Sequence, residues 1–295
     1  MKFGRVYTLL AEGRDTSFAK GTQHVINFPL TCRFKVNNAA LPFAGESVFQ
    51  IFNLAPEVRR DLQKDYFQKD VQKIMTFSAG YASDLPIPTI FQGTITTAFS
   101  YRQGPDWITE ITGRDGCFAQ QNAQINLSFP SPYILKDILA RVVETMKPYG
   151  VTQGAIGDFS SQNSRGTTFC GNTWDLLINT ILPLDAQISI SKGKIYILNQ
   201  NEIIKLEGTI DKIDADSGLL ESPRHQDNML MCKMIFEPRM EMFQEIEVSS
   251  IEPGNSGKWK IQRVDHLGTI SGAVGETLNT NVTLFRTGEE FAVAA

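Results

Sequence analysis

Alternating apolar and polar residues predict a strand-rich segment over residues 1–120. Residues 32–36 alternate cleanly, as expected for a strand with one buried face. Residues 96–102 and 107–112 flank a turn that contains Gly104 and Pro105, which predicts a hairpin. Further strands are predicted at residues 24–28, 48–52, 73–77 and 90–95.

One short amphipathic helix interrupts these strands. Asn53 is a candidate N-cap, and Pro56 falls in the first turn, where its missing N–H costs nothing. One face of the helix is apolar and consists of Leu54, Val58 and Leu62. The whole segment predicts a small β-barrel or sandwich that closes near Asp115-Gly116.

Helical periodicity begins near Ser131, a candidate cap with Pro132 at the first helical position. Apolar residues at helical spacing predict one buried face: Ile134, Leu135, Ile138, Leu139, Val142, Val143 and Met146. Asn172 or Thr173 is expected to cap a second helix, whose inward residues would be Trp174, Leu177, Ile178 and Ile181. Alternation on both sides of Lys192-Gly193 then predicts a hairpin over residues 188–197. These elements form a compact α+β unit.

A polar stretch, residues 214–224, separates this unit from a second β-rich segment. Residues 229–236 are almost continuously apolar and predict a strand buried on both faces. Later strands are expected at residues 243–248, 257–264 and 281–285. We therefore predict a mainly β protein with an α+β insert. Its three domains would be two β-barrel or sandwich domains, residues 1–120 and 201–295, and the α+β domain between them, residues 121–200.

Composition narrows the classes of function. A hydrophobic content of 42% and a charged content of 20% are ordinary globular values. A net charge of −4 without a basic tract argues against nucleic-acid binding, and no run is long and apolar enough for a membrane span. The N-terminal apolar stretch reaches Glu12 and Arg14 too soon for a signal peptide. We expect a soluble protein made in the cytoplasm.

Candidate catalytic and metal-binding residues are scattered. The four cysteines (Cys32, Cys117, Cys170 and Cys232) form no Cys-x-x-Cys pair, so we expect buried free thiols, and the three histidines (His24, His225 and His266) offer no zinc spacing. Asp216-Ser217-Gly218 matches the short aspartic protease signature but lacks the apolar strand before it, so a polar linker is favoured. No spacing selects a glycosidase pair among Glu12, Asp158 and Glu221. His266 is interpreted as a hydrogen-bonding residue at a strand end. We predict no catalytic, cofactor-binding or metal-binding residues and no cofactor.

Several motifs, in chain order, resemble those of tailed-phage baseplate and tail hub proteins. The main one is Asp216-Ser217-Gly218-Leu219-Leu220-Glu221-Ser222-Pro223, followed by an apolar strand, Pro238-Arg239 and the run from Gly257 to His266. The last motif departs from the family pattern after Leu267-Gly268, where Thr269 replaces an acid. Three upstream segments also resemble the family: Ile51-Phe52-Asn53-Leu54-Ala55, Asp106-Trp107-Ile108-Thr109 with Asp115-Gly116, and Gly171-Asn172-Thr173-Trp174-Asp175-Leu176-Leu177 with the hairpin after it.

The resemblance implies a non-enzymatic structural protein of the virion tail or baseplate, assembled in the host cytoplasm. In such hubs two tube-like β-domains per protomer alternate around a ring. A homotrimer thereby offers about six-fold symmetry to the tail tube. The implied partners are the tail tube protein, the tail-tip spike or other baseplate proteins, and the tape measure protein. Trp107, beside the hairpin turn, is either an interface anchor or an aromatic residue partly buried in its own domain.

Two alternatives remain open at this point. One is a hexameric tail tube or distal-tail component of the same virion. The other belongs to a different class: a tail-associated cell-wall or peptide hydrolase.

Overall fold

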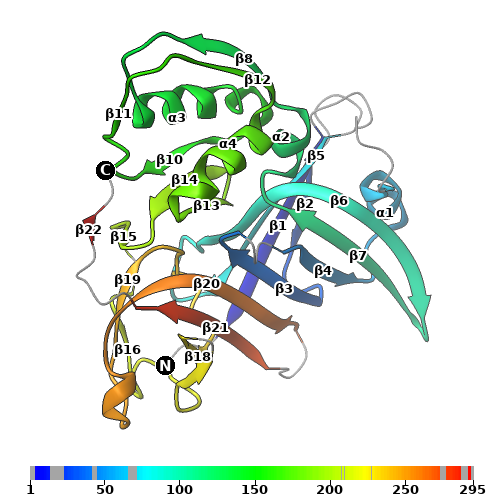
Figure 1. Cartoon of the computed structure of the whole chain (residues 1–295). Helices are drawn as coiled ribbons and strands as arrows, with labels where there is room; N and C mark the ends of the chain where they lie inside the picture. The colour runs from blue at the N-terminus through cyan, green and yellow to red at the C-terminus, as the bar shows by residue number, and fades with distance from the viewer. Residues whose placement is uncertain are drawn as a thin grey trace.

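A computed structural model gives the fold of this chain. It describes residues 4–13, 23–41, 45–65, 72–206, 208, 210–226, 228–272, 277–286 and 292–293. Residues 1–3 and 14–22, which contain part of the N-terminal stretch discussed above, lie outside the described residues. The fold is mainly β, with a small helical unit beside a large sheet, as predicted (Figure 1).

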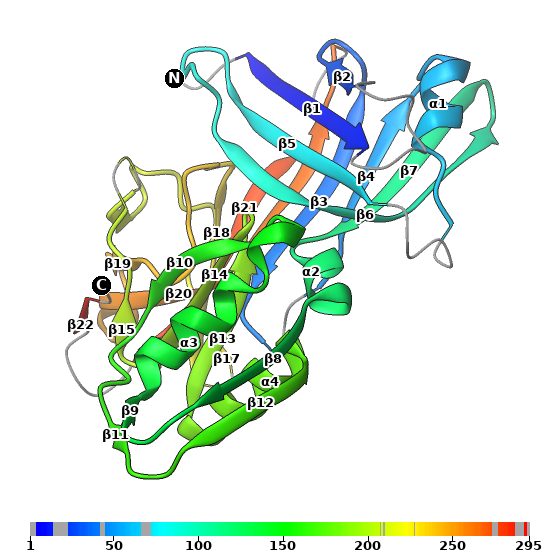
Figure 2. The same ribbon diagram turned by 90° about the horizontal axis from the view of Figure 1, so that it is seen from above.

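One antiparallel sheet runs through both β-rich segments in the order β17-β18-β21-β20-β3-β4-β7-β6-β5-β1-β2. The strands from the first segment are β1 (Arg5–Gly13), β2 (Gln23–Asn27), β3 (Cys32–Ala39), β4 (Ser47–Phe52), β5 (Lys73–Tyr81), β6 (Thr89–Gln103) and β7 (Asp106–Arg114). Those from the second are β16 (Lys212–Ile213), β17 (Arg224–Gln226), β18 (Met229–Ile235), β19 (Glu245–Val248), β20 (Gly257–Ile270) and β21 (Leu278–Phe285). The 3-10 helix η3 (Pro253–Asn255) precedes β20. β1 and β5 form a layer that crosses β3, β4 and β7 (Figure 2).

The first segment buries its apolar residues between these layers. Alternation in β3 and β4 sends Phe34 and Phe49 to the same side, where both rings lie 4.9 Å from the ring of Phe77 on β5. Helix α1 (Pro56–Leu62) closes this core with Leu62. Residues 90–95 and 96–102, predicted as two strands, form the single strand β6, which has a register shift between Ile95 and Thr97.

The second segment builds a separate core from β18, β20 and β21. Our prediction that residues 229–236 are buried on both faces is wrong. Leu230, Cys232 and Met234 point into the core, whereas Met231 is 45% exposed on the opposite face. The apolar run hides the alternation because a methionine, rather than a polar residue, occupies an outward position.

β3 and β20 pair with each other and join the two segments into one sheet. The register runs from Cys32 opposite Ile270 to Ala39 opposite Arg263. Asn37 and Asn38, interpreted from the sequence as the end of a strand, lie inside this pairing. The sequence did not predict this pairing, because asparagines usually mark turns.

The middle unit contains the remaining helices: α2 (Cys117–Asn122), α3 (Leu135–Glu144), α4 (Thr173–Ile181), and the 3-10 helices η1 (Lys147–Tyr149) and η2 (Leu182–Leu184). Its small sheet consists of β10 (Thr152–Ile156), β14 (Lys194–Asn199) and β13 (Ala186–Ser191). A ribbon of β8 (Gln124–Phe129) and β12 (Thr167–Asn172), together with β9 (Tyr133–Ile134) and β11 (Gln162–Asn163), completes the unit. Helices α3 and α4 lie between ribbon and small sheet (Figure 1). Near the C-terminus, β22 (Ala292–Val293) pairs with β15 (Glu202–Ile203).

Two predicted helix caps are wrong, and one is confirmed. Asn53 adopts a left-handed conformation before α1 and does not cap it. Helix α3 begins at Leu135, after the short strand β9, so Ser131 does not cap it. Ile134 is consequently 41% exposed rather than buried. Asn172 caps α4, as one of the two sequence alternatives proposed.

The described residues contain three buried apolar clusters, one in each β segment and one in the middle unit. The division of the chain into three domains stays a prediction. Three of the four cysteines are buried free thiols as expected, whereas Cys170 on β12 is exposed.

Candidate interaction surface

The face of the large sheet that points away from the buried clusters is mainly polar, although it also carries Met231, Leu267 and Val48. Antiparallel register aligns four of its residues in a row across four strands: Lys233 on β18, Asn281 on β21, Asp265 on β20 and Asn37 on β3. An adjacent row continues across β20, β3, β4 and β7 through Leu267, Lys35, Val48 and Thr112. One face of an antiparallel sheet can be exposed to water, and the polar side chains of this face allow it to be.

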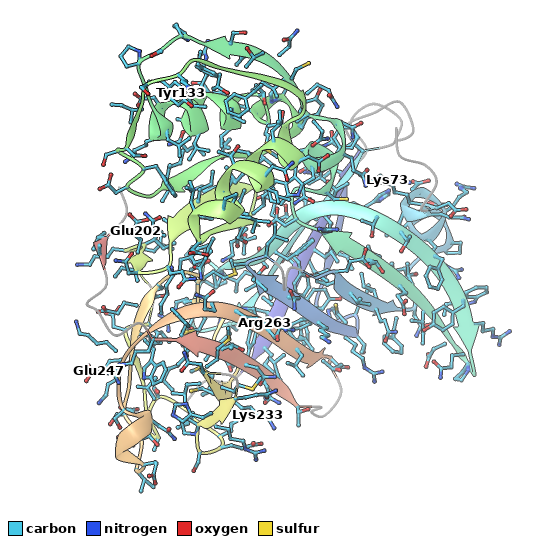
Figure 3. The ribbon with its side chains drawn as sticks, viewed as in Figure 1. Lys73, Tyr133, Glu202, Lys233, Glu247 and Arg263 are labelled. Carbon is cyan, nitrogen blue, oxygen red and sulfur yellow. The ribbon has the colours of Figure 1, made fainter. Side chains whose placement is uncertain are left out.

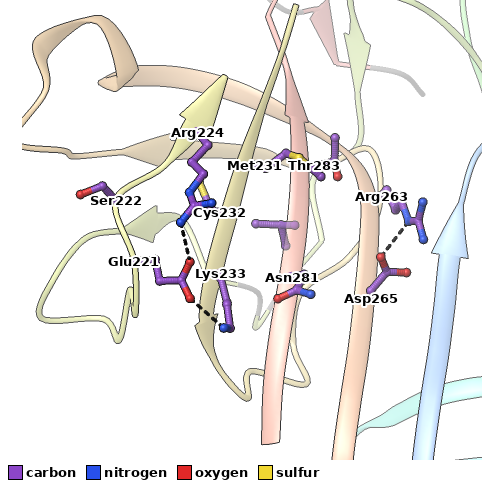
Figure 4. A pocket seen from close by; sticks show the side chains of 11 residues that line it. Glu221, Ser222, Arg224, Met231, Cys232, Lys233, Arg263, Asp265, Asn281 and Thr283 are labelled. Carbon is purple, nitrogen blue, oxygen red and sulfur yellow. Dashed lines mark hydrogen bonds and ion pairs between the residues drawn. The ribbon is translucent and has the colours of Figure 1, made fainter. Parts of the chain in front are cut away.

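A shallow groove of about 280 Å³ lies on this face, over β18, β21 and β20 (Figure 4). Lys233 Nζ lies 2.7 Å from Glu221 Oε1, and Arg263 Nε lies 2.8 Å from Asp265 Oδ2. Asn37 Nδ2 donates a hydrogen bond of 2.9 Å to Asp265 Oδ1. Lys233 and Arg263 both come from the second β segment (Figure 3). The positive and negative side chains of the groove are thus paired with one another. We interpret the groove as a surface for contact with another protein.

The stretch 214–224 forms a turn and then covers the outer edge of β18. The Asp214 carboxylate accepts a 2.7 Å hydrogen bond from Ser217 N–H. Beyond the turn, Leu220 N–H donates to the carbonyl of Lys233 at 2.9 Å. Gly218 permits this path because its φ is +103° and an added Cβ would lie 2.4 Å from Ile235 Cγ1. The polar linker inferred from the sequence is thus the element that protects a strand edge.

The candidate catalytic residues do not form a common site. Asp216 is exposed in the turn just described. Glu12 accepts a hydrogen bond from Gln23 on the neighbouring β2, and Asp158 accepts one from Ser160 N–H beyond β10. Glu221 pairs with Lys233 in the groove, where the ammonium holds the pKa of the carboxyl below its usual range. Within the described ranges, no group of three histidine, cysteine or acidic side chains is arranged to hold a metal ion.

His266 lies within β20, not at a strand end. Its Nδ1 is 3.0 Å from the hydroxyl of Thr280, which accepts a hydrogen bond from Glu237 N–H. Burial, with a smaller effect of the Lys192 charge, lowers the pKa of His266 to about 3. The ring is therefore neutral at physiological pH, and its predicted role as a hydrogen-bonding residue is correct.

Two buried ionisable residues, missed in the sequence, attach the middle unit to the large sheet. Asp115, just after β7, accepts a 3.2 Å hydrogen bond from Gly193 N–H in the β13–β14 turn. Its other oxygen is shielded from solvent without a hydrogen-bond partner, and desolvation raises its pKa to about 7. At the other end of this hairpin, Lys260 Nζ donates to the carbonyls of Asn199 and Gln200, both at 3.1 Å. Burial lowers the pKa of Lys260 to about 7.

The β6–β7 hairpin carries exposed aromatic rings. Trp107 is 40% exposed, and the guanidinium of Arg59 on α1 lies 4.0 Å from its ring centre. On the opposite face of the hairpin, Phe99 is 47% exposed and stacks against Tyr101 at 6.0 Å. Trp107 is therefore partly packed against its own segment, whereas Phe99 is the more accessible ring.

Comparison with known proteins identifies the family. The sequence model described as "Baseplate hub gp41" matches residues 14–267, most of the chain. The chain belongs to this baseplate hub family. It is a structural component of a bacteriophage baseplate and is located in the virion tail. No protein with a curated description matches the sequence.

Solved structures share the fold of this baseplate hub protein at low sequence identity. The tail protein from Neisseria meningitidis MC58 is 9% identical, with a TM-score of 0.61 over 97% of this chain and 98% of that one. The prophage MuSo2 43 kDa tail protein from Shewanella oneidensis is 10% identical, with a TM-score of 0.58 over 95% and 96%. A chain of the lidded Francisella PdpA–VgrG complex is 8% identical, with a TM-score of 0.58 over 99% of this chain and 54% of that one. No helix in the described part of the chain is long and apolar enough to span a membrane.

Proposed function

We propose that this hub protein forms a homotrimeric ring that joins the tail tube to the tail-tip spike or fibres. Eight strands, β17-β18-β21-β20-β3-β4-β7-β6, form a continuous run with one mainly polar face. Four of them come from each β-rich segment, and each set of four rests on its own buried cluster. Three copies would therefore present six four-stranded units to the tail tube.

The single observation that carries this proposal is the β3–β20 pairing. It joins the two four-stranded sets side by side in one sheet. We propose that the second set takes a position around the ring axis equivalent to that of the first. In this arrangement the polar face lines the ring and the middle unit, residues 121–200, decorates its outside. Residues 1–120 and 201–295 are the two ring-forming domains.

The role we propose is structural and not enzymatic. The candidate acids Asp216, Glu12, Asp158 and Glu221 have separate hydrogen-bond and ion-pair partners or lie exposed, and His266 is buried and neutral. Paired carboxylates or an accessible base are what a hydrolase of these residues would need. The partners we propose are the tail tube protein, the spike or other baseplate proteins and the tape measure protein, with assembly in the host cytoplasm.

Negative-stain class averages of the purified protein test the ring. The expected particle has three-fold symmetry and a central opening. A six-subunit ring would instead favour a tail tube or distal-tail role. A zymogram on cell-wall peptidoglycan and a casein gel test whether the protein is an enzyme. Hydrolysis that is lost in Asp216→Ala or His266→Ala would contradict a structural role.

A further inference from the structure

The hairpin β13–β14 connects the middle unit to both β-rich segments (Figure 1). Its turn lies against the end of β7, where Asp115 accepts the hydrogen bond from Gly193 N–H. Its other end lies against β20, where the Lys260 ammonium donates to the carbonyls of Asn199 and Gln200. A buried anion from the first segment and a buried cation from the second thus hold backbone groups at the two ends of one hairpin.

One half of this junction is apolar, and the other contains a cavity. Beside Lys260, Leu198 belongs to the buried cluster of the second β segment, and the ring of Tyr196 lies 6.2 Å from that of Phe243. Beside Asp115, a cavity of about 30 Å³ extends between β3, the end of β7, α2, α4 and β13. The middle unit has a separate buried cluster within residues 119–197, so opening of the junction would leave that core intact.

At the turn of the hairpin, the surrounding charges compensate the burial of Asp115 only in part. One oxygen of its carboxylate is shielded from solvent and has no hydrogen-bond partner among the described residues. Desolvation raises the pKa of the carboxyl to about 7, although backbone N–H groups and the Lys192 ammonium act in the opposite direction. Lys192 itself pairs with Glu241 of the second β segment, which reduces its effect on Asp115.

The other ionisable groups around the turn keep one charge state near neutral pH. Burial raises the pKa of Tyr196 on β14 to about 12 and also raises the pKa of the Cys117 thiol in α2. His266 is neutral because its pKa is lowered to about 3, and Arg114, which lines the cavity, is positively charged. Asp115 is therefore the group at this end whose charge changes near neutral pH.

At the base of the hairpin, Lys260 is the corresponding group. Burial lowers its pKa to about 7, although the charge of Glu202 acts in the opposite direction. The ammonium lies 5.1 Å from the ring centre of Phe243. Glu245, opposite Lys260 on β19, forms its ion pair with Lys258 instead. The charged ammonium is thus held by carbonyl groups, an aromatic ring and one nearby carboxylate.

The two buried groups respond to pH in opposite directions. Folding raises the pKa of Asp115 from 3.8, so its ionised form weakens the closed junction progressively between about pH 4 and 7. Folding lowers the pKa of Lys260 from 10.5, so its charged form weakens the junction below about pH 7, and the loss is recovered towards about pH 10. Both losses are nearly complete at pH 7. Most proteins are instead at their most stable between about pH 5 and 8.

We propose that the junction is a pH-responsive hinge, at which the middle unit opens away from the large sheet most readily near neutral pH, with Asp115 and Lys260 as opposed sensors. The apolar contacts at the base keep the closed state dominant, and the two buried charges set how often it opens. The middle unit thereby changes its position while the three buried clusters stay intact.

Native-state hydrogen exchange tests the hinge. Leu41 N–H donates to the carbonyl of Ile188 across the junction at 3.2 Å, so its exchange rate, divided by the intrinsic rate at each pH, reports opening. We expect the equilibrium constant for opening to be at least about fivefold larger at pH 7 than at both pH 5 and pH 9. The amides of Met146 and Phe52, each hydrogen-bonded within its own unit, are expected to show no such maximum.

Two substitutions separate the sensors. Asp115→Asn is expected to abolish the rise in opening between pH 5 and 7 and to keep the fall above pH 7. Lys260→Met is expected to keep the rise and to abolish the fall. Asp137→Asn and Lys147→Met are the matched controls, because they remove the same charges from exposed positions of the middle unit, and both should keep the wild-type profile.

Three results would overturn the hinge. The first is an opening constant for Leu41 that is independent of pH or smallest at pH 7. The second is a maximum that persists in both Asp115→Asn and Lys260→Met, because the sensors would then lie elsewhere. The third is an equal maximum at Met146 and Phe52, because the whole protein, rather than the junction, would then respond to pH.

Discussion

Asn172 connects two helices of the middle unit, and its replacement by alanine is expected to destabilise both. The Asn172 Oδ1 accepts hydrogen bonds from Trp174 N–H at 2.9 Å and Asp175 N–H at 3.1 Å, the first free donors of α4. Its Nδ2 donates to the carbonyl of Gln120 at 2.9 Å, in α2. Loss of an N-cap costs about 1 kcal/mol and loss of a further hydrogen bond about 1 kcal/mol, so we expect a loss of roughly 2 kcal/mol in unfolding free energy.

Asn172→Asp separates the two roles of this side chain. A carboxylate keeps the acceptor at the start of α4, where the helix dipole favours negative charge. It cannot donate to Gln120, and it brings a negative charge close to that carbonyl. We expect the Asp variant to lose only about 1 kcal/mol and to keep the amides of Trp174 and Asp175 protected from hydrogen exchange.

Urea unfolding followed by circular dichroism, with amide exchange on the same variants, measures both effects. Asn126→Ala is the control, because Asn126 is an exposed asparagine on β8 of the same unit. The reasoning would be refuted if Asn172→Ala unfolded within about 0.5 kcal/mol of the wild type, a change typical of surface positions. It would also fail if the Asp variant lost amide protection as the Ala variant does.

Three further substitutions test other parts of the account. Gly218→Ala is expected to cost about 2 kcal/mol or more, because the new Cβ would lie 2.4 Å from Ile235 at a φ of +103°; urea unfolding within 0.5 kcal/mol of the wild type would contradict this. Folding raises the pKa of Asp115 from 3.8 to about 7, so the buried carboxylate lowers the free energy of unfolding progressively as the pH rises from about 4 to 7. Asp115→Asn should therefore stabilise the protein at pH 8, by at most about 4 kcal/mol, with the gain shrinking towards pH 4; a gain independent of pH in thermal melts would refute the cause. Phe77→Ala removes a fully buried ring that lies 4.9 Å from Phe49 and should cost about 3–5 kcal/mol in urea unfolding, whereas a loss below 1 kcal/mol would mean that this core is loosely packed.

Local patterns in the sequence predicted most individual elements, because each pattern reflects burial of one face. The stripe from Leu135 to Met146 is buried as predicted, and the hairpin around Lys192-Gly193 forms. Errors arose where a tertiary contact overrode the local signal. Asn53 is a residue type that often caps helices, but its side chain accepts a hydrogen bond from Trp107 N–H and so holds the turn end of the β6–β7 hairpin instead.

The interaction surface was less predictable than the elements, because it depends on pairing between distant strands. Nothing local indicates that β3 and β20, more than 200 residues apart, share a register. The sequence placed Asp115 at a domain end and in one family motif but did not predict its burial, since that depends on the β13–β14 turn. The motif around Gly218 identified the family, and its role in covering β18 became visible only in the fold.

The mass of the purified protein in solution, measured by light scattering across a range of concentrations, tests the central claim most directly. The account predicts a species of three times 32.9 kDa. A particle of six subunits, or a monomer at every concentration, would contradict the trimeric ring.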